Sequence, residues 1–397
     1  MRDSLSSQIL GRLRSGLHSW VWIDVLIPLL LTRFALILAG WFSTGLLPNP
    51  EYPTKEAVAR GWNFSSHRWL DIWGRWDTGW YFSIVQNGYS VSNDIYHVQS
   101  NIAFFPFYPY LIKLLLLPFP AQMLTPGRLL LAGVLLSNAF LLGALILLHK
   151  LVTSLADRDV ARRTILYLLL FPTGFFLSCF YTESTFLFLS VGAFYAAHRR
   201  AWMTACLFGC CLALTRPLGV LISVPLFWMY LAGAEWKLNR IKANVLWFLL
   251  IPAGLLSFFF YAYRLTGDFL APMHAQKAWQ KVFAMPWNTI LDPVGGTPHM
   301  MRVDQAFTIL FLAGAVLSLR KLPSASYGIY ALLLILPPLT SGTLISTTRY
   351  YVVVFPVFIV FALLGRRSDL ADQSIRVVFL SLQIMLMIAW CQFYWMV

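Results

Sequence analysis

Apolar runs long enough to cross a bilayer recur along the whole chain. Of its 397 residues, 59% are hydrophobic and only 12% are charged. Soluble domains carry charge on about a quarter of their residues, so this composition predicts a membrane protein. Because no soluble domain or internal repeat interrupts the runs, we expect residues 1–397 to form a single, all-α, polytopic membrane domain.

We expect about eleven transmembrane helices, most of them near the minimum length of about 17 residues. The expected spans are 24–47, 128–149, 162–180, 184–198, 202–215, 217–233, 244–264, 304–320, 324–340, 349–365 and 374–396. The stretches 162–198 and 202–233 could each form a tight helical hairpin or one broken element. Arg33, inside the first span, needs a buried acidic or backbone partner.

Basic residues gather in every second connection between these spans. Arg162 and Arg163 lie in one such connection, and Arg199 and Arg200 lie in another. Because loops rich in Lys and Arg stay on the cytoplasmic side, we expect the amphipathic N-terminus, residues 1–23, to be cytoplasmic and the C-terminus to lie outside. This orientation predicts a multi-pass protein of the cell (inner) membrane, or of the endoplasmic reticulum membrane if the source is eukaryotic.

Composition also excludes several classes of function. The net charge of +14 resides mainly in the short clusters between spans, so it does not indicate nucleic-acid binding. The five cysteines all lie in apolar runs, which argues against a disulfide framework or a zinc site. Since neither a metal-ligand spacing nor a Gly-rich phosphate loop occurs, we predict no obligatory metal or cofactor, although a divalent metal is compatible with the sequence.

Two long connections, 48–127 and 265–303, both fall on the outer side. In the first, the apolar run 111–117 follows several prolines and is too short to span. We expect a re-entrant or interfacial helix there. Since connections this long are uncommon without a function, the first outer loop is where we expect the functional site.

The first outer loop sets two carboxylates among arginines and tryptophans. Asp77 has Arg75, Trp76 and Trp80 around it, and an aromatic ring beside a carboxylate is a combination that binds sugars. The alternative is that Asp77 caps a helix that begins at the next residue. The other carboxylate, Asp71, is either functional or an ion-pair partner of a nearby arginine.

Four further charged residues lie at predicted outer ends of spans: Glu183, Arg216, Arg264 and Arg349. Guanidinium groups at one membrane face suit a lipid phosphate, although snorkelling to headgroups is the alternative for each of them. Glu183 either faces a protein cavity or favours a helix start through the helix dipole. His67, in the first outer loop, is a weaker candidate for binding.

Several of these segments resemble, in order, the motifs of one family. They are Arg75-Trp-Asp-Thr-Gly-Trp80 with Asn87-Gly-Tyr89, Asn101-Ile-Ala-Phe-Phe-Pro-Phe-Tyr-Pro109, Phe171-Pro-Thr173 with Phe180-Tyr-Thr-Glu-Ser184, Thr215-Arg-Pro-Leu-Gly219 and, more weakly, Thr348-Arg-Tyr-Tyr351. This series resembles the second GPI mannosyltransferase (PIG-V type). The eukaryotic enzymes have Arg-Ser-Asn-Gly where this chain has Arg216-Pro-Leu-Gly219, which leaves the acceptor open. A chain this short resembles a bacterial relative more than an enzyme of the GPI pathway.

The resemblance implies a GT-C glycosyltransferase fold. It implies that mannose moves from a polyprenyl-phosphate donor to an acceptor hydroxyl at the extracytoplasmic face, with inversion and with Asp77 as the general base. Together with the charge pattern, it leads us to predict a set of substrate-binding residues, namely Arg75, Trp76, Trp80, Glu183, Arg216, Arg264, Arg349, Asp71 and His67.

The sequence also allows other functions. A lipid or sugar transporter, or a flippase, could use the outer charges to line a path, and a non-catalytic membrane scaffold would need none of them. Within the enzyme class, the sugar could differ from mannose, and the acceptor could be a glycan, a glycolipid or a protein.

Overall fold

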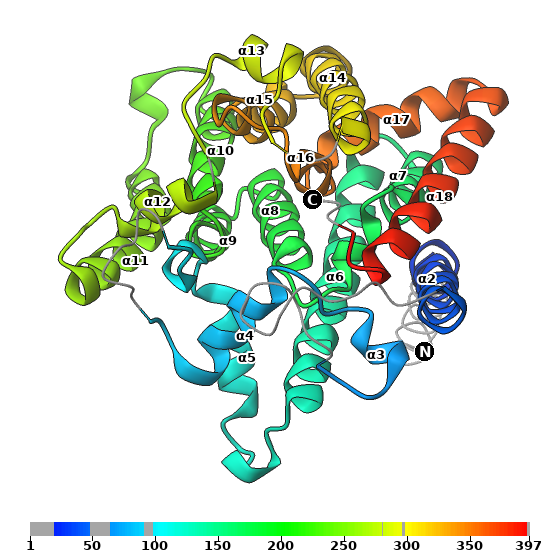
Figure 1. Cartoon of the computed structure of the whole chain (residues 1–397). Coiled ribbons are helices and arrows are strands. Elements are labelled where there is room, and N and C mark those ends of the chain that lie inside the picture. The colour runs from blue at the N-terminus through cyan, green and yellow to red at the C-terminus, as the bar shows by residue number, and fades with distance from the viewer. Residues whose placement is uncertain (1–19, 48–63, 91–97, 280, 296–297, 395–397) are drawn as a thin grey trace, which may run out of the picture.

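The long apolar runs fold into helices that stand side by side (Figure 1). The computed structural model describes residues 20–47, 64–90, 98–279, 281–295 and 298–394, and all regular secondary structure in these ranges is helical. The longer helices are α2 (Ile27–Leu46), α4 (Thr78–Asn87), α5 (Phe107–Leu116), α6 (Pro126–Leu155), α7 (Arg158–Leu170), α8 (Glu183–His198), α9 (Trp202–Ala213), α10 (Ser223–Gly233), α11 (Leu250–Thr266), α14 (Pro298–Lys321), α15 (Ala325–Ile335), α17 (Phe355–Arg367) and α18 (Asp369–Cys391). Short helices connect them, including α3 (Arg68–Asp71), α12 (Ala271–His274), α13 (Pro286–Leu291) and α16 (Thr347–Tyr351).

Five segments are long and apolar enough to cross a membrane, which makes the chain a multi-pass membrane protein. They are Val21–Leu46, Pro126–Leu155, Ala243–Thr266, Met300–Lys321 and Asp369–Cys391. The other predicted spans correspond to shorter helices, so the count of eleven stays a prediction. The predicted amphipathic N-terminus lies largely outside the described residues.

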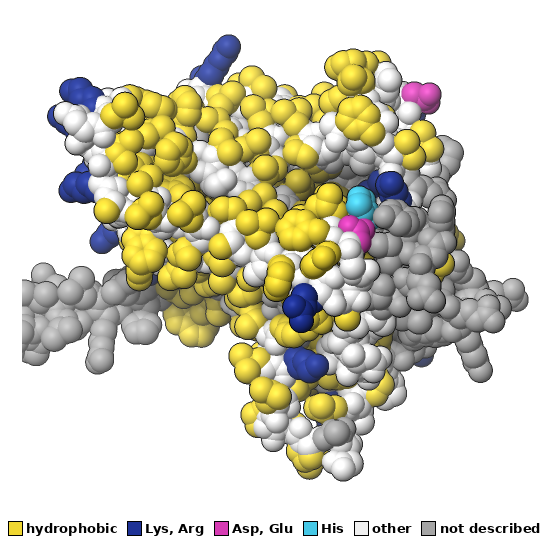
Figure 2. Space-filling model, turned by 90° about the vertical axis from the view of Figure 1, so that its left-hand side faces the viewer, with side chains coloured by type: hydrophobic (Ala, Val, Ile, Leu, Met, Phe, Trp, Pro, Cys, Tyr) yellow, Lys and Arg dark blue, Asp and Glu magenta, His cyan; other side chains and the backbone are white. Residues whose placement is uncertain are grey.

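The surface that carries α11 has the character of a lipid-facing surface. Figure 2 shows broad apolar cover on this face, with Lys and Arg side chains gathered along its left-hand edge. Leu256 and Phe260 of α11 are among its exposed apolar side chains. Since large exposed apolar surfaces mark contacts with lipid or with partners, this face is consistent with burial in a bilayer.

Two of the predicted spans are broken, and both breaks lie close to polar residues. The predicted span 162–180 ends as a helix at Leu170, because Phe171 precedes a proline and takes the extended conformation that this position favours (ψ 141°). The predicted span 349–365 is also divided, because α16 ends at Tyr351 and α17 begins only at Phe355, with a proline in its first turn. Non-helical backbone at membrane depth occurs where it is buried in protein or lines a cavity.

The first outer loop is anchored to the helices by backbone groups. The Phe180 N–H donates to the Trp73 carbonyl over 3.1 Å, and the indole N–H of Trp390 in α18 donates to the Ile72 carbonyl over 2.8 Å. The short helix predicted around 111–117 is present as part of α5, which packs against α4 and α6. The turn at Ile72 and Trp73 and the helices α4 and α5 of this loop thus pack against the long helices.

Arg33 in α2 has the backbone partner that the sequence requires. Its Nη1 donates to the Gly174 carbonyl over 3.1 Å and to the Ser178 hydroxyl over 3.0 Å. Both acceptors belong to the break between α7 and α8, so the buried guanidinium ties the first span to that break.

The far ends of these helices carry separate ion pairs. Asp24 is almost fully buried and accepts a hydrogen bond from Arg158 Nε at 2.6 Å. Asp372 accepts from Arg376 Nη2 at 2.7 Å. Arg158 begins α7, and the break that precedes Glu183 follows the other end of α7. The basic residues around Arg158 and this break therefore lie at opposite ends of α7.

The turn that carries Arg216 requires glycine at position 219. A Cβ at Gly219 would lie 2.2 Å from the Leu212 carbonyl oxygen of α9, and that oxygen already accepts the Thr215 N–H at 3.0 Å. The Gly219 N–H in turn donates to the Arg216 carbonyl at 2.9 Å. Only a residue without a side chain allows the segment to fold back so closely against the end of α9.

We therefore expect Gly219→Ala to destabilise the protein by about 1–3 kcal/mol and to move Arg216. The measurement is thermal unfolding of detergent-purified protein. Gly233→Ala is the matched control, because a Cβ at Gly233 meets no heavy atom within 4 Å. Equal melting temperatures for the two variants would contradict the close-approach explanation.

Candidate active site

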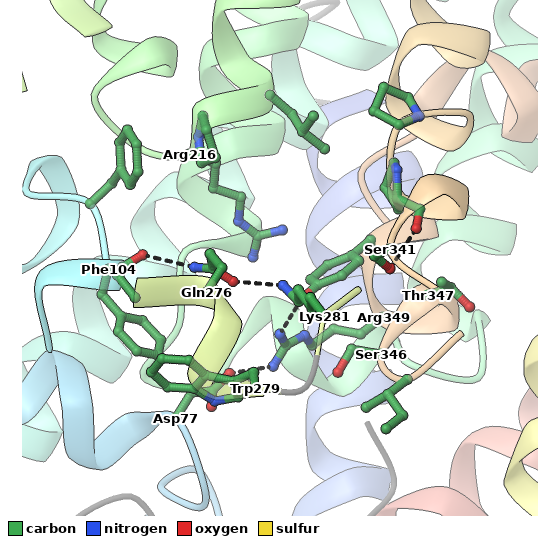
Figure 3. Close-up of a pocket in the computed structure, with 18 of the residues that line it drawn as sticks. Asp77, Phe104, Arg216, Gln276, Trp279, Lys281, Ser341, Ser346, Thr347 and Arg349 are labelled. Atoms are coloured by element: carbon green, nitrogen blue, oxygen red, sulfur yellow. Dashed lines mark hydrogen bonds and ion pairs between the residues drawn. The ribbon is translucent and has the colours of Figure 1, made fainter. Parts of the chain in front are cut away.

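A cavity of about 480 Å³ opens between the first outer loop, the turn after α9, the second outer loop and the segment around α16. Its charged lining consists of Asp77, Arg216, Lys281 and Arg349. Figure 3 shows these side chains converging from different parts of the chain. Three of the four are residues that the sequence singles out.

Asp77 directs its carboxylate to an arginine. The residue occupies the N-cap position of α4, but its side chain makes no capping hydrogen bond. Its Oδ2 instead accepts from Arg349 Nη1 at 2.9 Å. The capping interpretation of this side chain is therefore wrong, and the carboxylate faces the cavity (Figure 3).

The backbone around Asp77 is fixed by Tyr181, which lies in the break between α7 and α8. The Tyr181 hydroxyl donates to the Arg75 carbonyl at 2.9 Å and accepts the Asp77 N–H at 3.0 Å. Between these two residues, Trp76 has a φ of 51°, a left-handed conformation that is rare for a bulky residue. The hydroxyl thus bridges both sides of a strained turn and sets the position of the carboxylate.

Arg75 and Asp71 stabilise the same turn through an ion pair. The Arg75 guanidinium is buried, lies 2.8 Å from Asp71 Oδ2, and donates to the Gly74 carbonyl at 2.7 Å. The second Asp71 oxygen accepts the Ser65 N–H at 3.0 Å. Neither residue lines the cavity, so the structure favours the ion-pair alternative for Asp71 and makes Arg75 its partner.

Glu183, the first residue of α8, is fully buried and pairs with two arginines. Its Oε1 accepts from Arg216 Nη2 at 2.5 Å and lies 3.5 Å from Arg349 Nε. Arg216 also donates from Nε to the Thr182 hydroxyl at 2.9 Å. Because a buried carboxylate is costly unless it is paired, Glu183 serves as the anchor that keeps both guanidinium groups in the cavity wall.

Asp304, a carboxylate that no sequence motif singles out, positions Arg349. It is buried in α14, and its Oδ1 accepts the Thr348 N–H at 3.0 Å and the Thr348 hydroxyl at 2.5 Å. A carboxylate that accepts backbone N–H groups fixes the start of a short helix. Asp304 thereby fixes α16, from which Arg349 reaches Asp77.

The aromatic wall of the cavity differs from the expected one. Phe104 and Trp279 line the cavity, whereas Trp76 and Trp80 do not. Trp80 lies behind that wall, with its ring centroid 5.9 Å from that of Phe104 and 5.9 Å from that of Trp279. This aromatic wall thus combines Phe104 of the first outer loop with Trp279 of the second, and Trp80 supports it from behind.

Two further predicted binding residues also lie outside the cavity lining. Arg264 is exposed at the C-terminal end of α11, and His67 is exposed beside Trp69, with the two rings 6.4 Å apart. Neither lines the cavity. Substrate binding by Arg264 or His67 outside the cavity stays a prediction.

Three cavity residues that no sequence motif predicts come from the second outer loop. Gln276, Trp279 and Lys281 all line the cavity. Their only sequence signal is the length of the connection 265–303, because their spacing matches no motif. Among the described residues, no group of three or more His, Cys, Asp or Glu side chains is placed to hold a metal ion.

Comparison with known proteins identifies the family. A family model described as mannosyltransferase (PIG-V) matches residues 25–267. The chain belongs to this family, and it is a glycosyltransferase. The match includes Asp77, Glu183 and Arg216. A search of curated protein sequences gives no significant match.

The fold is that of GT-C glycosyltransferases. The chain is similar to ArnT from Cupriavidus metallidurans, whose crystal structure contains undecaprenyl phosphate, with a TM-score of 0.52 and 11% identity over 91% of this chain and 77% of ArnT. It is also similar to the oligosaccharyltransferase AglB from Archaeoglobus fulgidus, in complex with an inhibitory peptide and a dolichol-phosphate, with a TM-score of 0.47 and 13% identity over 91% of this chain and 56% of AglB.

We expect Tyr181→Phe to lower turnover about tenfold to a hundredfold, because a misplaced catalytic group costs rate steeply. It should also lower stability by about 1–3 kcal/mol, since a buried carbonyl and a buried N–H lose their partner. The measurements are glycosyl transfer and thermal unfolding of the purified protein. Tyr327→Phe is the control, because the Tyr327 hydroxyl is buried and has no hydrogen-bond partner among the described residues. Loss of activity in both variants would contradict a special role for Tyr181.

Proposed function

We propose that this enzyme transfers mannose from a polyprenyl-phosphate donor to an acceptor hydroxyl, with inversion and with Asp77 as the general base. The observation that carries the proposal is the Asp77 carboxylate, which lines a cavity of about 480 Å³ beside two arginines. Family membership supports the reaction class. The fold similarity to ArnT, which binds undecaprenyl phosphate, supports a polyprenyl-phosphate donor.

In the proposed step, the acceptor hydroxyl attacks the anomeric carbon of the mannose. Its proton passes to the Asp77 carboxylate as the new glycosidic C–O bond forms. The bond from the anomeric carbon to the phosphate oxygen breaks on the opposite side, and polyprenyl phosphate leaves with the bonding electron pair. A single displacement of this kind passes through an oxocarbenium-like state and inverts the anomeric centre.

The cavity has groups suited to each part of this reaction. Asp77 Oδ2 is held by Arg349 at 2.9 Å, and no hydrogen bond to Oδ1 occurs within the described part of the chain, so that oxygen is available to the acceptor. Arg216 and Arg349 favour the negative charge that develops on the leaving phosphate. The rings of Phe104 and Trp279 offer faces for the sugar.

The site is proposed to face the extracytoplasmic side. It lies at the breaks around Glu183 and Arg349, whereas the basic connections lie at the opposite end of α7. Because basic connections stay in the cytoplasm, the cavity opens outside, where lipid-linked sugars can enter from the outer leaflet. The acceptor class, whether glycan, glycolipid or protein, is left to experiment.

We expect Asp77→Asn to reduce mannose transfer about 10²- to 10⁴-fold, the range over which a general base contributes. The assay uses purified protein, radiolabelled polyprenyl-phosphate mannose and a lipid extract as the source of acceptor, with analysis of the product. The variant should still fold and bind the donor, because the amide keeps the shape of the side chain and can still accept from Arg349, which stays paired with Glu183. Its melting temperature should fall, since the ion pair between Asp77 and Arg349 is lost.

Asp159→Asn is the matched control, since Asp159 is an exposed carboxylate on α7 that pairs with Arg163. Near-normal turnover by the Asp77→Asn variant would refute its role as base. Wild-type protein that moves the intact donor across vesicles without transferring the sugar would favour the transporter.

A further inference from the structure

The second outer loop contributes a strap, residues 271–279 together with Lys281, that is fixed against the first outer loop. Gln276 Nε2 donates to the Ala103 carbonyl at 3.3 Å. Ala271 and Ala275 of the strap are fully buried, and Trp279 lies against Phe104 with the ring centroids 5.8 Å apart. The strap therefore forms a fixed wall of the cavity, and its polar side chains have defined positions.

Lys281 is the one residue of this strap that brings a positive charge into the cavity. The side chain is half-buried, and its Nζ donates to Gln276 Oε1 at 2.7 Å. Gln276 is a neutral partner. Across the described residues, no carboxylate lies within ion-pair distance of Lys281, whereas Arg216 and Arg349 both have one.

The charges around the cavity do not balance. The positive groups are Lys281, Arg216 and Arg349. The negative groups are Asp77, which lines the cavity, and Glu183, which pairs with Arg216 directly behind the lining. Counted over the residues that the structure describes, three positive charges against two negative ones leave one positive charge. Because each carboxylate already accepts from an arginine, the uncompensated charge belongs to Lys281.

A partly buried cation without a counter-ion favours an anionic ligand. Figure 3 shows the end groups of Arg216, Lys281 and Arg349 directed into the same cavity. An ammonium group is a strong point charge that suits a phosphate oxygen. Its bond to Gln276 holds it on the wall that faces the arginines.

We propose that Lys281 binds the phosphate of the lipid-linked donor, while Arg216 and Arg349 stay paired with Glu183 and Asp77. This inference rests on the proposed function and deepens it. A phosphodiester-linked sugar carries a single negative charge, which matches the single positive charge in excess. When the phosphate leaves as a monoester its charge approaches −2, and Lys281 stabilises that gain.

The test measures binding of undecaprenyl phosphate to the purified protein in detergent, alongside donor kinetics. We expect Lys281→Met to weaken this binding about tenfold or more, as a charge-assisted hydrogen bond is worth about 1.5–3 kcal/mol. The variant should raise the KM for the donor more than it lowers kcat, and Lys281→Arg should restore most of the affinity. Lys277→Met, an exposed lysine of the same strap outside the cavity lining, should bind as the wild type does.

A second variant tests charge without removing the lysine. Gln276→Glu keeps the size of the side chain but gives Lys281 a carboxylate partner, so it should weaken binding in the same direction. Undiminished binding of undecaprenyl phosphate by Lys281→Met and by Gln276→Glu would overturn the proposal.

Competition identifies the source of the phosphate group. Undecaprenyl phosphate should be displaced poorly by inorganic phosphate and by phosphatidic acid. Displacement by either at equal concentration would overturn the assignment to the donor. These measurements need no sugar transfer, so the two proposals can fail separately. If Lys281→Met loses binding but the wild type transfers no sugar, only the proposed function is refuted. If the wild type transfers sugar but Lys281→Met binds undecaprenyl phosphate normally, only the role of Lys281 is refuted.

Discussion

Arg349 is the residue on which the arrangement of this site depends. Its guanidinium bonds Asp77 at 2.9 Å and lies 3.5 Å from Glu183, so it joins the first outer loop, the start of α8 and the short helix α16. Removing one partner of a buried ion pair costs about 3–5 kcal/mol, because the remaining charge is left unpaired. A chain that keeps these three charges inside a membrane protein must therefore fold so that they meet.

The breaks in the helices make that meeting possible. An unbroken helix through 162–180 would satisfy its own backbone and would leave no place for Tyr181 to reach the Asp77 turn. Pro172 ends α7, and the segment that follows supplies Tyr181 and the backbone acceptors for Arg33. At the start of α16, the Asp304 carboxylate accepts the Thr348 N–H in place of a helical carbonyl.

Much of this was predictable from the sequence, since apolar runs determine helices and the composition determines the membrane class. The motif order also identified Asp77, Glu183, Arg216 and Arg349, four charged residues that the structure brings together. The breaks were predictable only in part, because a proline signals a probable end of a helix but not how the freed backbone is satisfied. Trp279 and Lys281 were not predictable, because their role depends on how a distant loop packs against Phe104, which no local spacing encodes.

The pairing of Asp77 with Arg349 also links the two halves of the proposed reaction. Arg349 bonds Oδ2, so the carboxylate can accept a proton on Oδ1 without first breaking the ion pair. Once protonated, Asp77 no longer carries the charge that attracts the guanidinium, at the moment when the leaving phosphate gains its second negative charge. Glu183 keeps the arginine in the cavity throughout. The same cation therefore orients the base before the transfer and favours the leaving group after it, without a large movement of the chain.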